Sequence, residues 1–125
     1  SADLGSIIVV VATDAPLSPL ALRHVARRAG LGLARGGTPG GNSSGDIFLA
    51  FSTADIGPMP QKAGPRIARE EINMETLDPL YLATVEAVEE AVVNALVAGE
   101  DVATFRPAGR MVPAIGAERL RRIFA

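Results

Sequence analysis

A continuous run of mostly β-branched residues, Ser6 to Thr13 (SIIVVVAT), limits the possible folds of this chain more than any other segment. An unbroken apolar run of this kind is typical of a strand that is covered on both faces, because a half-exposed strand alternates apolar with polar residues. A second such run is Asp46 to Phe51 (DIFLAF). Because two strands alone do not form a stable sheet, we expect another polypeptide to supply the remaining strands.

Helices are predicted between and after the two strands. Ser18 and Pro19 form the pattern of an N-cap followed by a first-turn proline, and apolar residues then recur at helical spacing up to Leu33. A second long helix is expected from Asp78 to about Ala98; it is apolar on most of its circumference. A short final helix is predicted over Ala117 to Phe124. These elements predict an α/β fold of the layered type, with helices outside and sheets inside.

Composition bounds the function. The chain has 125 residues, 48% hydrophobic and 21% charged, which is the size and composition of one globular domain. A formal charge of -2 gives no sign of a basic face for nucleic acid. The absence of cysteine excludes disulfides and zinc-thiolate sites, and a single histidine excludes a histidine metal cluster within this chain. No apolar run approaches the roughly 20 residues of a membrane span.

The dipeptide Gly5-Ser6 stands directly in front of the first strand, where a rigid support would present a serine hydroxyl at a sheet edge. The chain offers this serine no obvious base, since His24 lies within a helix among arginines. If the Gly5–Ser6 bond were cut, the new α-amino group would have a pKa near 7.7–8.0 and would act as the general base. On the dipeptide alone, an ordinary residue at the start of a strand is the simpler interpretation.

A polar segment, residues 42–46 (NSSGD), enters the second strand and is able to place a hydroxyl and a carboxylate beside the start of the first. The alternative is turn chemistry, because Asn, Ser, Gly and Asp are the usual residues of any tight connection. Taken by itself, this segment favours the turn.

Three runs in this order resemble one family: GSIIVVVATDAPL, then ALRHVARRAGLGLAR, then NSSGDIFLAFSTA. They are similar to the DmpA/BapA-type aminopeptidases, peptidase family S58, which comprises L-aminopeptidase/D-amidase-esterases and β-peptidyl aminopeptidases. The resemblance is strong over residues 5 to 55 and looser beyond. It implies an αββα sandwich like that of Ntn hydrolases, shared with an α subunit from the same precursor.

The resemblance also implies roles for individual residues. Gly5 would be the last residue before the self-cleaved bond and Ser6 the nucleophile at the start of the small β subunit. Ser44 would be the second serine, which hydrogen-bonds the nucleophile and its amine. Asp46 takes the place of the supporting acid, which is a glutamate in some relatives. The oxyanion donor and most of the substrate pocket would lie on the α subunit.

One departure from the family pattern is that residues 1–5 (SADLG) precede Ser6, although the β subunit is expected to begin at the nucleophile. These five residues would belong to the end of the α segment. Residues 6–125 would be the β-subunit part of a single α/β domain. Ser1 is the competing nucleophile, but it stands on a polar lead-in, whereas Ser6 opens the strand. Asp14 and Asp55 are expected to be cap or turn residues, and His24 a partly exposed helix residue.

The resemblance implies an enzyme that hydrolyses an N-terminal residue from short peptides, amides or esters through an acyl-enzyme on Ser6. It needs no metal or organic cofactor, and leaves open whether the residue is an L-, D- or β-amino acid. Oligomers of the αβ unit and a cytoplasmic location are expected. Two alternatives stay open: an acyltransferase of the ornithine acetyltransferase type, which is expected to use threonine, and a non-catalytic partner subunit.

Overall fold

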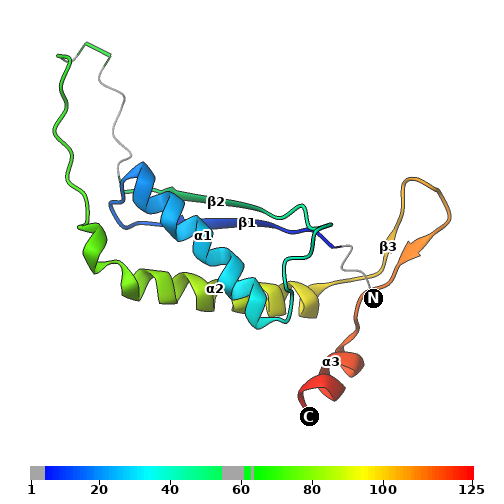
Figure 1. Ribbon diagram of the computed structural model, residues 1–125. Helices are drawn as coiled ribbons and strands as arrows, with labels where there is room; N and C mark the ends of the chain where they lie inside the picture. The colour runs from blue at the N-terminus through cyan, green and yellow to red at the C-terminus, as the bar shows by residue number, and fades with distance from the viewer. Residues whose placement is uncertain (1–4, 55–60, 63) are drawn as a thin grey trace. The chain divides into compact units, whose positions relative to one another are not determined.

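The computed structural model describes residues 5–54, 61–62 and 64–125, so Ser1 and Asp55 lie outside the described residues. The chain divides into two units, residues 1–88 and 89–125, and helix α2 runs from the first into the second. In chain order the first unit contains strand β1 (Ile8–Thr13), helix α1 (Pro19–Arg35), strand β2 (Ile47–Ser52), the 3-10 turn η1 (Met74–Thr76) and the start of helix α2 (Asp78–Ala98) (Figure 1).

The two strands of the first unit pair in parallel, with Ile8 opposite Ile47 and Thr13 opposite Ser52. A parallel pair requires a crossover connection, and α1 with its flanking loops provides it. Both strands therefore begin at the same edge of the sheet. This edge is where the segments that precede β1 and β2 meet.

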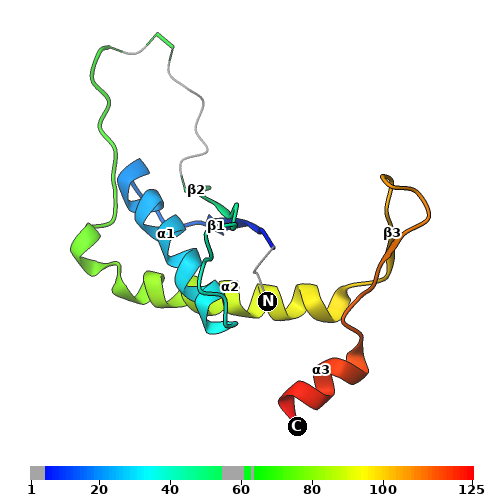
Figure 2. The ribbon, with the colours of Figure 1, turned by 45° about the vertical axis from the view of Figure 1, so that its right-hand side comes forward.

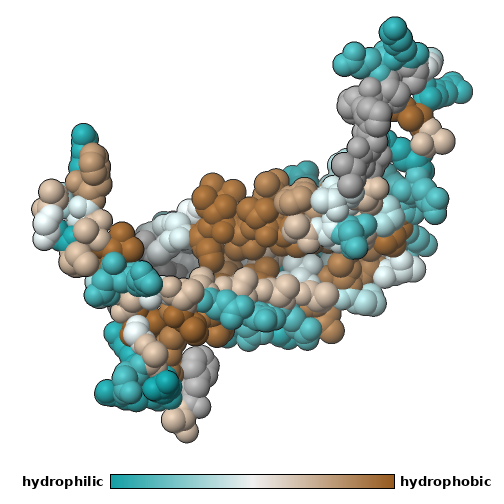
Figure 3. All heavy atoms as spheres, turned by 180° about the vertical axis from the view of Figure 1, so that it is seen from behind, coloured by the Kyte–Doolittle hydropathy of each residue, from teal (hydrophilic) through white to brown (hydrophobic). Residues whose placement is uncertain are grey.

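The two faces of this sheet differ in their cover. Helix α1 lies against one face of the sheet (Figures 1 and 2). The side chains on that face are half-buried: Val9, Val11, Phe48 and Ala50. The opposite face, called here the open sheet face, consists of large apolar side chains that are between 41% and 72% exposed: Ile8, Val10, Ile47, Leu49 and Phe51. Figure 3 shows hydrophobic side chains gathered over the strands on this side. The sequence predicted that both faces of the strands would be covered. Within the described residues only the face against α1 is covered.

The core lies between α1, the sheet and the start of α2. Leu17, Ala21, Val25 and Leu77 form a buried cluster, against which Val11 and Ala50 of the strands and Leu80 and Tyr81 of α2 also pack. The predicted N-cap is confirmed, because the Ser18 side chain accepts a hydrogen bond from the Ala21 amide at 3.1 Å. Because this cap fixes the residue at which α1 begins, it also determines which α1 side chains face the sheet.

Helices α1 and α2 approach closely at Gly32. A Cβ built on Gly32 would lie 2.6 Å from the Val85 carbonyl oxygen and 2.8 Å from the Val88 Cβ. Gly30, one half-turn earlier, faces the sheet instead, and a Cβ there would lie 3.6 Å from the Phe48 ring. The first contact excludes any side chain and the second is an ordinary van der Waals distance.

The second unit contains the end of α2, a small hairpin and the final helix. Strands β3 (Val102–Ala103) and β4 (Met111–Val112) pair antiparallel, and helix α3 spans Ala117–Phe124, as predicted. The hairpin was not predicted, because two-residue strands have no periodicity to detect.

Helix α2 keeps exposed apolar residues, as expected, among them Leu82, Val93, Leu96 and Val97. No helix in the described part of the chain has the length and hydropathy needed to cross a membrane.

The Gly32 contact generates a stability prediction. Gly32→Ala should lower the thermal midpoint, because forcing a methyl group into packed atoms costs about 1–3 kcal/mol. Gly30→Ala is the matched control in the same helix; it should be neutral or stabilising by up to about 1 kcal/mol, since alanine favours helix over glycine. Thermal melts of the full protein measure both. Equal midpoints for the two variants would contradict the close approach of α1 and α2.

Candidate active site

The parallel register brings the residues before β1 beside the residues before β2. Partners across the pair differ by 39 positions, so the same register carried beyond the strands places Ile7 beside Asp46 and Ser6 beside Gly45. Two hydrogen bonds confirm this placement: one joins Ile7 to Asp46, and the other joins Gly45 to Ser6. The two polar elements that the sequence analysis singled out therefore lie at one sheet edge.

Asp46 ends the ladder of hydrogen bonds between the strands. The Ile7 carbonyl accepts from the Ile47 amide at 3.0 Å, so the polar groups of Ile7 face β2. In a regular parallel ladder the Ile7 amide would donate to the Gly45 carbonyl. Here it donates to the Asp46 Oδ1 at 3.0 Å. The carboxylate of Asp46 is half-buried and takes the place of a backbone acceptor next to Ser6.

Ser6 is exposed, and its hydroxyl oxygen accepts a hydrogen bond from the Gly45 amide at 3.0 Å. Both the distance and the donor are those of an ordinary N–H···O bond. An oxygen that accepts in this way keeps its own proton available for transfer to a base. Gly5, immediately before it, is also exposed.

Ser44 lies at the same edge, one residue before Gly45. It is half-buried, and its amide donates to the Gly41 carbonyl at 2.9 Å, which tightens the loop entering β2. The hydrogen bond expected between Ser44 and Ser6 remains a prediction. Sequence reasoning missed Gly45, because its contribution is a backbone N–H that no side-chain pattern reveals.

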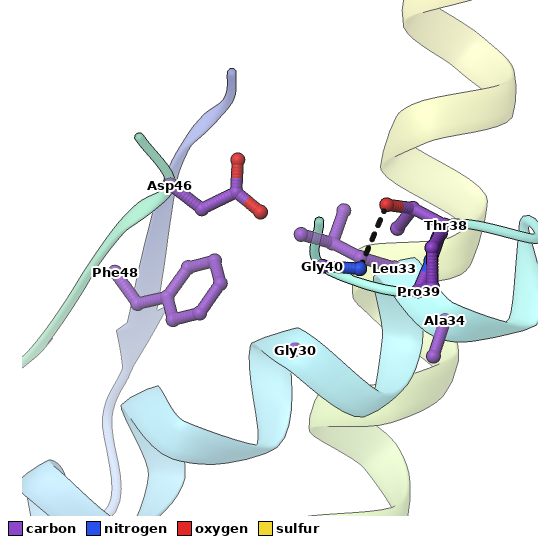
Figure 4. A pocket seen from close by; sticks show the side chains of 8 residues that line it. All are labelled: Gly30, Leu33, Ala34, Thr38, Pro39, Gly40, Asp46 and Phe48. Carbon is purple, nitrogen blue, oxygen red and sulfur yellow. Dashed lines mark hydrogen bonds between the residues drawn. The ribbon is translucent and has the colours of Figure 1, made fainter. Parts of the chain in front are cut away.

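A shallow cavity of about 210 Å³ opens beside Asp46, between α1 and β2 (Figure 4). Its walls are mostly apolar, with the Phe48 ring and the end of α1 on opposite sides and Asp46 at one end. The full lining is Gly30, Leu33, Ala34, Thr38, Pro39, Gly40, Asp46 and Phe48. Ser6 is not part of it, so the cavity adjoins Asp46 and not Ser6.

His24 takes part in the contact between helices. Its Nδ1 lies 3.5 Å from the Tyr81 hydroxyl, and the Arg28 guanidinium lies over the Tyr81 ring at 3.9 Å from the centroid. These contacts join α1 to α2, which accounts for His24 without catalysis. Asp14 is exposed after β1. Among the described residues, no three acidic, cysteine or histidine side chains gather as a metal site would require.

Comparison with known proteins gives this edge its context. The sequence pattern of "Peptidase family S58" matches residues 1–109. The chain belongs to peptidase family S58. The match includes Gly5, Ser6, Ser44 and Asp46 and confirms the resemblance found in the sequence.

Relatives of this S58 chain include a "Beta-peptidyl aminopeptidase BapA" from Sphingosinicella xenopeptidilytica, 44% identical over 98 residues, 78% of this chain and 24% of the relative. Among solved structures, the L-aminopeptidase D-Ala-esterase/amidase from Ochrobactrum anthropi superposes with a TM-score of 0.82 at 54% identity, covering 95% of this chain and 33% of that one. A Burkholderia sp. beta-aminopeptidase gives 0.77 at 43% identity, covering 98% and 35%.

These neighbours establish the fold. The Ochrobactrum anthropi enzyme is described as a prototype of the serine aminopeptidases and a variant of the Ntn hydrolase fold. The S58 chain is therefore an α/β piece of an Ntn-hydrolase-type fold, as the resemblance implied. It spans about a quarter of the length of the curated relatives and about a third of the solved chains.

The hydrogen bond from the Ile7 amide to Asp46 generates a prediction that distinguishes the role of the side-chain oxygen from the role of its negative charge. Asp46→Ala leaves the Ile7 amide without its acceptor, which should cost about 1–3 kcal/mol and lower the thermal midpoint. Asp46→Asn keeps a side-chain oxygen at this position and should restore most of that stability. If the asparagine variant melts as low as the alanine variant, the hydrogen bond at this edge is not what Asp46 contributes.

Proposed function

We propose that this chain is the nucleophile-bearing part of a serine aminopeptidase or amidase, with Ser6 as the nucleophile after cleavage of the Gly5–Ser6 bond. The observation that carries the proposal is the geometry of the sheet edge. The exposed Ser6 hydroxyl accepts from the Gly45 amide at 3.0 Å, and the Asp46 carboxylate is fixed one residue further along. Membership in a peptidase family supports this interpretation of the edge.

Self-cleavage would use the same hydroxyl. The Ser6 Oγ attacks the Gly5 carbonyl carbon, a C–O bond forms, and the C–N bond of the peptide breaks as the nitrogen takes up the hydroxyl proton. Water then hydrolyses the ester, which releases a Gly5 carboxylate and regenerates the hydroxyl. Glycine favours this step because a residue without Cβ enters strained backbone conformations at low cost.

Turnover would follow the same chemistry on a substrate. The new α-amino group of Ser6, with an ordinary pKa near 7.7–8.0, accepts the Oγ proton as the hydroxyl attacks the substrate carbonyl. The proton passes to the departing amine or alcohol, and an acyl-enzyme ester remains on Ser6. Water, activated by the same amine, releases the acid.

The substrates proposed are short peptides, amides or esters that carry a free N-terminal residue. The relatives support this class, since their names describe a beta-peptidyl aminopeptidase and an L-aminopeptidase with D-Ala-esterase/amidase activity. Ser44 is proposed to hydrogen-bond the nucleophile and Asp46 to orient this network. A serine at position 6 disfavours the acyltransferase alternative, which is expected to use threonine.

The partner proposed is the remainder of the same precursor, seated on the open sheet face. That face presents Ile8, Val10, Ile47, Leu49 and Phe51 to solvent in this chain. An apolar patch of this kind is an aggregation hazard if left uncovered, and so are the outer edges of β1 and β2, which pair with no other strand in the described part of the chain. The length of the relatives supports this proposal, since this chain covers only 24% to 35% of them.

Ser6→Ala tests the nucleophile. In the full precursor this variant should remain one polypeptide on a denaturing gel, because the hydroxyl that attacks Gly5 is gone. It should also resist a serine-reactive acylating agent, whereas the parent protein should take up one equivalent at Ser6. Ser43→Ala is the matched control: this exposed neighbour should be cleaved and labelled like the parent. Normal splitting of the Ser6→Ala precursor would refute intramolecular attack by this residue.

Leu49→Asp tests the open sheet face. Co-expressed with the upstream region, this variant should fail to assemble, because burying an unpaired carboxylate in an apolar interface costs several kcal/mol. Ile67→Asp is the control, since Ile67 and Leu49 have similar exposures of 58% and 56% but Ile67 lies outside the sheet. Size-exclusion chromatography measures both. Assembly of the Leu49 variant at the level of the control would show that the partner does not cover this face.

A further inference from the structure

Position 45 is occupied by glycine although its backbone conformation does not require one. Glycines at positive φ, where other residues are strained, are Gly37, Gly40, Gly109 and Gly116 among the described residues. Gly45 is not one of them, so its φ does not require glycine. The reason for a glycine at this position must therefore lie in the space around it.

That space is bounded by the nucleophile. A Cβ built on Gly45 would lie 3.1 Å from the Ser6 Oγ and 3.8 Å from the Ser6 Cβ, and both described atoms within 4 Å belong to Ser6. A methyl group at 3.1 Å is closer than an ordinary van der Waals contact, so either the hydroxyl or the strand edge would have to move. The missing side chain thus keeps the position of the Ser6 hydroxyl open.

The same residue supplies the hydrogen-bond donor. The Gly45 amide donates to the Ser6 Oγ at 3.0 Å. As a proton leaves this oxygen, negative charge develops there, and a backbone N–H aimed at it becomes a charge-assisted donor of greater strength. A donor of this kind favours attack by Ser6 both on Gly5 and on a substrate.

The residues on either side of Gly45 hold its amide in place. Before it, the Ser44 amide is bonded to the Gly41 carbonyl at 2.9 Å. After it, the Asp46 carboxylate accepts from the Ile7 amide at 3.0 Å, and the next residue, Ile47, enters the ladder. Because both neighbours are fixed to β1 or to the loop, the Gly45 N–H has little freedom to turn away from Ser6.

We propose that Gly45 is a positioning residue for the nucleophile: its N–H orients the Ser6 Oγ, and its lack of a Cβ leaves room for that oxygen in this position. The inference rests on the proposed function, since it assigns Gly45 a part in the chemistry of Ser6. It also accounts for the single glycine of the NSSGD segment, whose φ is not positive and does not require glycine.

The test is Gly45→Ala in the full precursor, with an aminoacyl p-nitroanilide as substrate. Self-cleavage should slow, and kcat should fall on the order of 10²-fold, the cost of a small displacement of a reacting atom. KM and the thermal midpoint should stay near the parent values, because substrate binding and packing are not involved. Gly64→Ala is the control, since a Cβ there meets no described atom within 4 Å, and it should behave like the parent.

A second measurement removes the dependence on self-cleavage. Residues 6–125, produced with Ser6 at the N-terminus, are co-expressed with the upstream region as a separate chain, and kcat is compared for the parent and Gly45→Ala pairs. A parent-like kcat in the variant would overturn the role of Gly45 while leaving Ser6 as the nucleophile. A fall in kcat that is matched by a large drop in thermal midpoint would also overturn it, in favour of a structural role. Activity in a Ser6→Ala pair would instead overturn the proposed function itself.

Discussion

The parallel pairing of β1 with β2 is the constraint on which the rest of the described site depends. The two hydrogen bonds that place Asp46 beside Ile7 and Gly45 beside Ser6 each span 39 positions, the same offset as the ladder itself. Because side chains alternate along a strand, a slip of one residue would turn Phe48 away from α1 and move Asp46 away from the Ile7 amide. The register therefore determines both the packing of the sheet and the geometry of its edge.

What fixes this register is the packing on the helix side. Phe48 lies under Gly30 of α1, and Ala50 contacts the buried cluster around Val25 and Leu77. Helix α1 is itself held by its Ser18 cap and by its close approach to α2 at Gly32. Small residues at these contacts let helix and strand backbones come near one another. The chemistry at the strand starts is thus positioned by apolar contacts further along the chain.

Much of this fold could be predicted from residue patterns. The proline and serine at the start of α1 and the apolar periodicity of both long helices gave boundaries that the structure reproduces within about two residues, the usual uncertainty of helix ends. The strands begin at Ile8 and Ile47, slightly later than the apolar runs, because Asp46 ends the ladder early. An apolar run predicts only that both faces of a strand are covered. It therefore did not distinguish the face that α1 covers from the open sheet face.

The site was predictable only in part, for a physical reason. Asp, Ser and Gly before a strand are equally suited to turns, and the hydrogen bonds that decide between the two uses join residues distant in sequence. The resemblance to a family pointed to Ser6 and Asp46, whereas the Gly45 amide required the register. Sequence reasoning thus singled out the side chains of Ser6 and Asp46 and missed the backbone group that faces Ser6.

The alternation of side chains also links folding to the proposed chemistry. Ser6, Ile8 and Val10 are exposed, whereas Ile7, Val9 and Val11 are half-buried, so Ser6 continues the row of the open sheet face. A partner that buries this apolar row would also pass close to Ser6 at its end. The same association would then cover the strands and enclose the Ser6 hydroxyl, where reduced access of water strengthens each electrostatic contact. While this face stays uncovered, the Ser6 hydroxyl would remain in water, so the proposed self-cleavage and turnover would both depend on the rest of the precursor packing against the open sheet face.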